Sequence, residues 1–232
     1  MAAQKLPTPP NPTGSFQLPD IAHTLVDMVE VASEDSLAKL LEQMNQHVAA
    51  NELRAAVGLL ETADAQLKET ATWLNARGLV AFRFGEFGAS LDYFQQALDK
   101  NGPTAEILSN LGAVHLERAK GSAGAQQREA YQQALEYLNK ALFLEAGNPN
   151  ILTNLALAYN LAGDMSRCEL YLDRTLARDP RHPAALFQKA QLLYERGSLA
   201  DSLKLIDTIL EDDPDQPEAT AQRNLILDRL SF

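Results

Sequence analysis

The chain has 232 residues, enough for one elongated repeat domain or one to two globular domains, and 46% of them are hydrophobic but only 6% aromatic. Leucine and alanine must therefore supply most of the packing surface. The formal charge of −11 opposes binding to nucleic acid or to an anionic membrane without a local basic patch, and the single cysteine, Cys168, excludes an internal disulfide and a paired-cysteine metal site.

The N-terminal region divides into two parts. Residues 1–19 hold five of the eleven prolines and are expected to form a tail that does not fold alone. Residues 20–32 are expected to form a short amphipathic helix, which either caps the first repeat, lies in a groove of the chain, or docks on another subunit. No apolar stretch of signal-peptide or membrane-spanning length occurs, so we expect a cytoplasmic protein without direct membrane insertion.

The rest of the chain repeats with a period of 34 residues. The proline pairs 180/183 and 214/217 show this period, and so do Gly163 and Gly197. One unit reads Leu152-x2-Leu155-Ala156-x2-Tyr159, Gly163, Cys168-x3-Leu172-x2-Thr175, and the next reads Leu186-x2-Lys189-Ala190-x2-Leu193, Gly197, Ser202-x3-Ile206-x2-Ile209. Similar units begin at Leu40, Leu74 and Leu108, and the last of these fits only with about ten extra residues between its helices.

Two helices per unit, small residues at fixed offsets and this period resemble the tetratricopeptide-repeat (TPR) family. The resemblance implies an all-α solenoid of antiparallel helix pairs in a right-handed superhelix over residues 33–232. The repeats are expected at about 37–70, 71–104, 105–148, 149–182 and 183–216, with an insertion near 119–129 and a capping helix at 217–230.

The small residues have a packing reason of their own. Four of them stand where the two helices of a unit are expected to cross, namely Gly78, Gly112, Ala156 and Ala190. The second helix presents small residues in return, at Ser90, Ala134, Cys168 and Ser202. Larger residues fill the space towards the next unit, at Phe94, Leu138, Leu172 and Ile206.

The sequence contains no recognisable catalytic or cofactor-binding motif, so we predict no enzyme activity, no cofactor and no metal. His47 and His115 fall where an aromatic residue fills the core of a repeat, and Cys168 occupies a packing position. A small basic edge with Tyr131 and Tyr137 is expected to be solvated helix surface; its cations are Arg118, Lys120 and Arg128.

In the family that the chain resembles, the first helix of each unit lines an inner groove. A peptide-binding lining is therefore predicted at Asn75, Leu79, Phe82, Asn110, Leu116, Asn154, Leu157, Phe187, Gln188 and Tyr194. Asn110, Asn154 and Gln188 occupy equivalent places, so their amides either bind the backbone of an extended peptide or bond across helices within the solenoid. Both interpretations stay open at this point.

The chain does not match the two-carboxylate clamp of TPR proteins that bind chaperone C-termini, because asparagine, alanine and glutamine hold its basic places. We therefore expect a non-catalytic adaptor that binds a protein or peptide segment in the groove, within a multiprotein assembly. The alternatives are a self-assembling scaffold that oligomerises through residues 20–32, and a chaperone or assembly factor for a secretion or pilus-type system.

Overall fold

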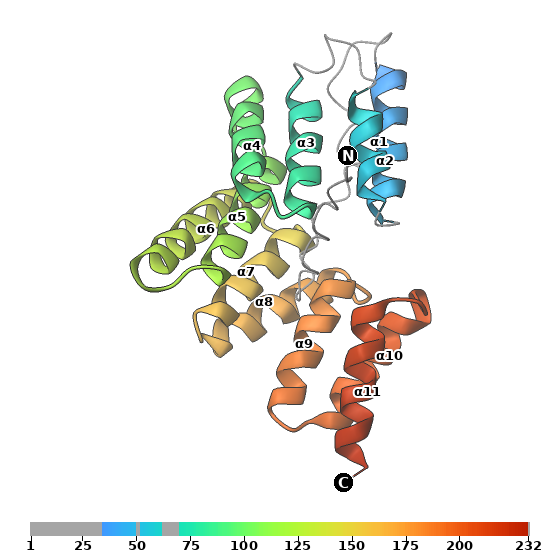
Figure 1. Ribbon diagram of the computed structural model, residues 1–232. Helices are drawn as coiled ribbons and strands as arrows, with labels where there is room; N and C mark the ends of the chain where they lie inside the picture. The colour runs from blue at the N-terminus through green and yellow to red at the C-terminus, as the bar shows by residue number, and fades with distance from the viewer. Residues whose placement is uncertain (1–33, 50–51, 62–69, 232) are drawn as a thin grey trace, which may run out of the picture.

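The computed structural model describes residues 34–49, 52–61 and 70–231, and every regular element in these ranges is an α-helix (Figure 1). The predicted tail 1–19 and helix 20–32 lie outside the described residues. The helices are α1 Glu34–Ala49, α2 Leu53–Glu61, α3 Ala71–Arg83, α4 Phe87–Asn101, α5 Ala105–Lys120, α6 Gly124–Leu144, α7 Pro149–Leu161, α8 Met165–Arg178, α9 Pro183–Glu195, α10 Leu199–Asp212 and α11 Pro217–Leu230.

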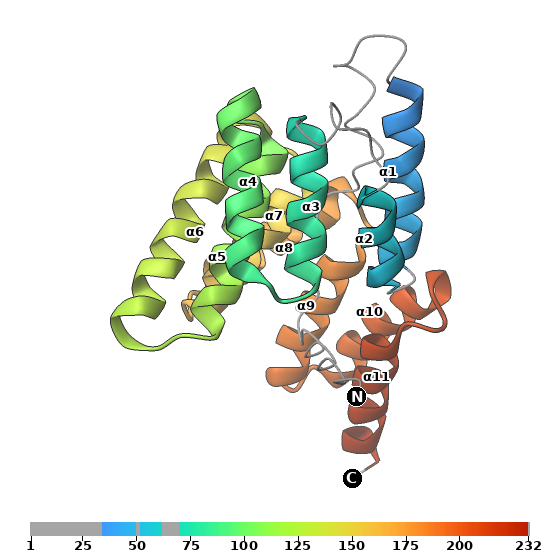
Figure 2. The same ribbon diagram turned by 45° about the horizontal axis from the view of Figure 1, so that its top comes forward.

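Successive helices pack as hairpins, and the hairpins stack into a curved array (Figures 1 and 2). Each second helix also contacts the first helix of the next hairpin. The first helices α3, α5, α7 and α9 contact one another in sequence, so they form a continuous layer. We call the surface of this layer that faces away from α4, α6, α8 and α10 the inner face.

Short-range signals set where the helices begin. Pro149, Pro183 and Pro217 lie in the first turns of α7, α9 and α11, where a missing backbone N–H is not needed. Thr70 and Thr104 cap α3 and α5 by accepting backbone N–H groups of the first turn. The second proline of each pair that marked the period, Pro183 and Pro217, therefore marks a helix start in the fold.

Glycine closes the turn between the two helices of three hairpins. Gly85, Gly163 and Gly197 have φ of 76°, 75° and 81°, a conformation that side chains other than glycine rarely adopt. In each hairpin the following residue donates its backbone N–H to the carbonyl five residues earlier, for example Glu86 to Ala81 at 2.9 Å. This shared turn fixes the angle at which the second helix returns.

The third hairpin, α5–α6, accommodates its extra residues as helix. α5 has 16 residues against 13 in α3, α7 and α9, and α6 has 21 against 14 or 15 in α4, α8 and α10. The extra residues were predicted to lie between the two helices, and this was wrong, because they lengthen the helices and the connection is only 121–123. The run Gln126 to Ala130 consists of good helix formers, which explains why α6 extends into this segment.

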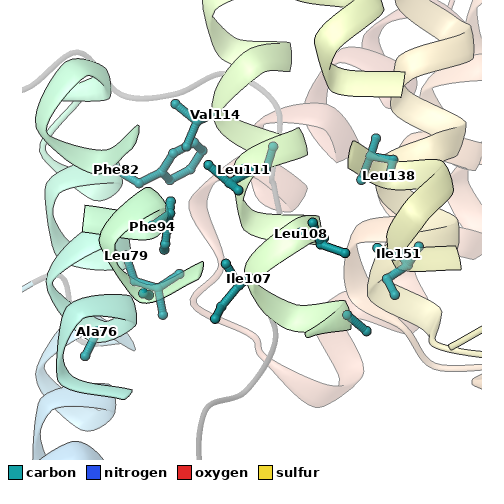
Figure 3. Close-up of a cluster of buried hydrophobic side chains, with 14 of the residues drawn as sticks. Ala76, Leu79, Phe82, Phe94, Ile107, Leu108, Leu111, Val114, Leu138 and Ile151 are labelled. Atoms are coloured by element: carbon teal, nitrogen blue, oxygen red, sulfur yellow. The ribbon is translucent and has the colours of Figure 1, made fainter. Parts of the chain in front are cut away.

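The crossing positions pack as the sequence predicted. A Cβ atom on Gly78 would lie 2.5 Å from a ring carbon of Phe94, and one on Gly112 would lie 2.6 Å from Cγ of Leu138. Ser90 donates its hydroxyl to the Gly78 carbonyl at 2.8 Å, and Ser202 does the same to Ala190 at 2.7 Å. Figure 3 shows Phe94 and Leu138 within the buried cluster that extends from α1 to α7.

Candidate functional site: the inner face

The apolar residues of the predicted lining pack in two separate buried clusters. Leu79, Phe82, Leu116 and Leu157 belong to the large buried cluster, whereas Phe187 packs in a separate cluster with residues of α10 and α11. Nine of the ten residues are less than a tenth exposed, and the tenth, Tyr194, is half-buried beneath the guanidinium of Arg229. Their role in peptide binding stays a prediction.

The amide side chains form a ladder between successive first helices. Asn110 of α5 donates from Nδ2 to Oδ1 of Asn75 on α3 at 3.0 Å. Asn154 of α7 donates from Nδ2 to Oγ of Ser109 on α5 at 3.2 Å. In both cases the amide bonds to the polar residue that stands just before the equivalent position of the preceding repeat. Two of the three amides thus bond across helices within the solenoid.

The third amide does not follow this rule. By the same rule Gln188 would bond to Thr153 of the preceding repeat. The Thr153 hydroxyl instead donates to the Pro149 carbonyl at 2.8 Å and lies 3.4 Å from Oγ1 of Thr175. Oε1 of Gln188 is buried without a hydrogen-bond donor among the described residues, and so is Oδ1 of Asn110. Two of the predicted lining residues thus each have a buried acceptor oxygen without a donor among the described residues.

Glu106 extends the ladder and was missed in the sequence. Its Oε1 accepts from Nδ2 of Asn75 at 2.7 Å, so Glu106, Asn75 and Asn110 form one hydrogen-bonded chain. Burial raises the pKa of this carboxyl to about 7, opposed by the bond from Asn75 and assisted by the charge of Glu145. Glu106 precedes Asn110 by four residues and so shares its helix face, which is the signal that sequence reasoning had available.

Two side chains with catalytic potential, His115 and Cys168, are core residues. His47 was also predicted in the core, and this was wrong, because its side chain is 36% exposed and its Nδ1 lies 2.6 Å from Oε2 of Glu52. His115 stacks on Tyr137 with ring centroids 5.6 Å apart, and burial, together with the charge of Arg118, lowers its pKa to about 4. Cys168 is buried, and burial raises the pKa of its thiol to about 11, which opposes formation of a nucleophilic thiolate. Over the described ranges no group of three or more histidine, cysteine or acidic residues is placed to hold a metal ion.

The basic residues predicted at the edge of the third hairpin make local contacts and line a small hollow. Lys120 pairs with Glu117 at 2.9 Å, and the hydroxyl of Ser122 donates to the Arg118 carbonyl at 2.7 Å. Lys120, Arg128 and Tyr131 line a hollow of about 180 Å³ beside Leu161. Within the part of the chain that the structure covers, no helix is both long and apolar enough to cross a membrane.

Comparison with known families is decisive for the fold. Tetratricopeptide-repeat models match residues 41–106, 75–148 and 169–225, which together span more than half of the chain. The chain belongs to the tetratricopeptide-repeat family. The matches fall on both sides of the junction between the longer third repeat and the fourth.

Two solved structures share the fold at low sequence identity, and one further protein is similar in sequence. TTC0263, a thermophilic TPR protein of Thermus thermophilus, superimposes with a TM-score of 0.73 at 18% identity over 82% of this chain and 97% of that one. PilF of Pseudomonas aeruginosa gives a TM-score of 0.60 at 15% identity, with 87% of each chain covered. The Photosystem I assembly protein Ycf3 of Prochlorococcus marinus (strain NATL1A) is 26% identical over 157 residues, 63% of this TPR chain and 80% of its own.

Proposed function

We propose that this TPR protein is a non-catalytic adaptor that binds a segment of a partner protein on its inner face. The observation that carries the proposal is the pair of buried acceptor oxygens, on Asn110 and Gln188, beside apolar side chains of the same face. A buried acceptor without a donor is destabilising, and the backbone N–H of a bound peptide supplies such a donor. Leu79 and Leu157 would provide apolar contact alongside.

The affinity would come mainly from the apolar side chains. Each hydrogen bond to an amide contributes only ~0.5–1.5 kcal/mol net, so apolar burial on Leu79, Phe82, Leu157 or Phe187 must supply the larger part. Micromolar binding, at roughly −8 kcal/mol, is the expectation. These side chains are less than a tenth exposed, so a partner contacts them only after the atoms that cover them are displaced. We therefore expect an association rate constant below about 10⁵ M⁻¹ s⁻¹.

The experiment is affinity purification of the full chain with mass spectrometry, run beside inner-face variants. One variant combines Asn110→Ala, Asn154→Ala and Leu157→Glu. A milder one places charge at two half-buried inner-face positions, Asn160→Arg and Gln191→Arg, which are not core residues. Circular dichroism and urea unfolding confirm that each variant is folded.

The matched control is Leu170→Glu, the same substitution as at Leu157 but on the outer helix α8, where the side chain is 54% exposed. We expect the inner-face variants to lose specific partners that the control retains. Capture that is unchanged in a folded inner-face variant would reject the inner face as the binding site.

A second candidate function is a chaperone or assembly factor for a multiprotein complex. It is favoured by the 26% identity to a Photosystem I assembly protein, a name that describes that relative. An assembly factor leaves its client once the complex is complete, whereas an adaptor remains in it. Size-exclusion chromatography of the captured material separates the two, because an assembly factor elutes with the free client or intermediates and not with the finished complex.

A further inference from the structure

The chain of hydrogen bonds from Glu106 through Asn75 to Asn110 has a fixed direction. When Glu106 is ionised its carboxylate can only accept, so in that form Asn75 presents its NH2 group to Glu106 and its carbonyl oxygen to Asn110. Asn110 must then use its own NH2 group as the donor to Asn75. The oxygen that is left over, Oδ1 of Asn110, finds no donor within 34–49, 52–61 and 70–231.

Both ends of this chain of bonds are consequently acceptors. At one end stands the carboxylate of Glu106, half-buried on the first turn of α5 and close enough to Glu145 to feel its negative charge. At the other end, one helical turn along the same face, stands the fully buried Oδ1 of Asn110. One N–H of each amide is used in the bonds between α3 and α5.

Such a site favours a ligand group that carries positive charge and several N–H donors. A carboxylate or phosphate would be repelled by the negative charges of Glu106 and Glu145. A neutral hydroxyl could satisfy one acceptor but would leave the carboxylate uncompensated. An arginine guanidinium offers five N–H donors in a planar fork and a lysine ammonium offers three, and either neutralises the carboxylate.

The surroundings suit the stem of such a side chain as well. Leu79 of α3 and Ile107 of α5 are apolar members of the buried cluster, and Figure 3 shows both in the region between the two helices. Both are less than a tenth exposed, so a long aliphatic stem can pack on them only once the atoms that cover them are displaced, while its charged head reaches the acceptors. The overall charge of −11 would also attract a basic segment at long range.

We propose that Glu106 and Asn110 form a recognition site for an arginine or lysine side chain of the partner segment, so that the inner face selects basic sequences. This inference rests on the proposed function, since it names the kind of partner that the inner face accepts. Glu106 supplies the charge, Asn75 fixes the direction of the bonds, and Asn110 supplies the second acceptor.

The test is a selection from a phage library of random dodecapeptides on the immobilised full chain, with a parallel selection on Glu106→Gln. This substitution keeps the shape of the side chain and removes its charge. We expect peptides from the unmodified chain to share an arginine or lysine at one position and peptides from the variant to lack it. The matched control is Glu129→Gln, an exposed glutamate on the outer helix α6, which should select the same peptides as the unmodified chain.

Fluorescence polarisation with one enriched peptide then measures the pairing. Glu106→Gln should weaken binding by about tenfold or more, and so should replacement of the arginine by citrulline or of the lysine by norleucine. The two changes together should cost much less than the product of the separate losses, because they remove the same interaction.

The possible results separate this inference from the proposed function. Peptides that no longer bind when Gln191→Arg is introduced, but that share no basic residue, would overturn the inference and leave inner-face binding intact. Full affinity in Glu106→Gln would do the same. If no selected peptide is sensitive to Asn160→Arg or Gln191→Arg, inner-face binding itself fails and the inference fails with it.

Discussion

The crossing of α3 and α4 at Gly78 allows a quantitative prediction. A Cβ atom at this position would meet three ring atoms of Phe94 at 2.5, 2.6 and 2.9 Å, and Phe94 is fully buried and cannot swing away. Overpacking of this kind costs about 1–3 kcal/mol, and the severity of the contact places it near the upper end. Replacing glycine by alanine within a helix returns roughly 1 kcal/mol. We therefore expect Gly78→Ala to lower the free energy of unfolding by about 2 kcal/mol.

A matched control lies in the same hairpin. Gly88 is in α4, and no atom lies within 4 Å of the Cβ that alanine would add there. Because Gly88 lies in the first turn of α4, Gly88→Ala should stabilise the protein by about 0.4–1 kcal/mol, mainly by restricting the unfolded chain. Urea unfolding followed by circular dichroism measures the difference, and the emission of Trp73, the one tryptophan of the chain and a residue of α3, reports on this hairpin separately.

The chain itself supplies the rescue. In the fourth repeat the equivalent positions are Ala156 and Leu172, a pair that packs with both residues fully buried. Adding Phe94→Leu to Gly78→Ala reproduces that pair, so the double variant should be more stable than the sum of the single losses allows. If Gly78→Ala proves as stable as Gly88→Ala, or if Phe94→Leu gives no rescue, the proposed contact does not control this position.

Three further predictions concern groups whose pKa changes on folding. Burial lowers the pKa of His115 from 6.5 to about 4, so between these two pH values the folded state binds fewer protons than the unfolded state. Stability should therefore fall as the pH is lowered through that range, by on the order of 1 kcal/mol at pH 5 after allowance for solvent. His115→Phe should remove this loss, which thermal unfolding measures. Burial also lowers the pKa of His182, whose Nδ1 caps α9 by accepting the backbone N–H of Ala185. His182→Asn should keep this cap and make the protein less sensitive to acid. His182→Ala should remove the cap and lower the free energy of unfolding by about 1 kcal/mol at neutral pH. For Glu106 stability changes with pH in the opposite direction: its pKa is raised, so stability falls as the pH rises from 4.5 to about 7. Above pH 7, Glu106→Gln should therefore be more stable than the unmodified chain by about 1–3 kcal/mol in urea unfolding. Equal stability of the two forms there would contradict burial as the cause of the raised pKa.

The sequence predicted the fold well because the period is carried by local chemistry. Proline in a first helical turn and glycine with positive φ after a first helix act within a few residues of the chain, and Pro183 and Gly197 therefore have the effects that their spacing indicated. The capping helix was predicted at 217–230, and α11 has these bounds. The third hairpin was harder, since helix propensity decides whether extra residues extend a helix or form a loop.

The candidate site was only partly predictable. The sequence indicated the face on which Asn110 and Asn154 lie, because helical spacing determines it. It left open whether their amides bond across helices, and it did not indicate Asn75 and Ser109 as the partners, because those contacts depend on the offset between neighbouring repeats. Glu106 was missed for the same reason, since its role depends on a residue 31 positions earlier in the chain.

The lengthened third hairpin has a consequence for how the array can be redesigned. At 1.5 Å per residue, the additional residues of α6 carry its start roughly 10 Å beyond the level that a standard second helix would reach. Figure 2 shows the α5–α6 tip standing clear of the neighbouring hairpins. Residues 123–126 at this tip are exposed, so a tag or another domain can be joined there, whereas Lys120, Arg128 and Tyr131 lie beside Leu161 of the next hairpin and should be kept. The tip is the natural attachment point for a reporter that must leave the inner face open.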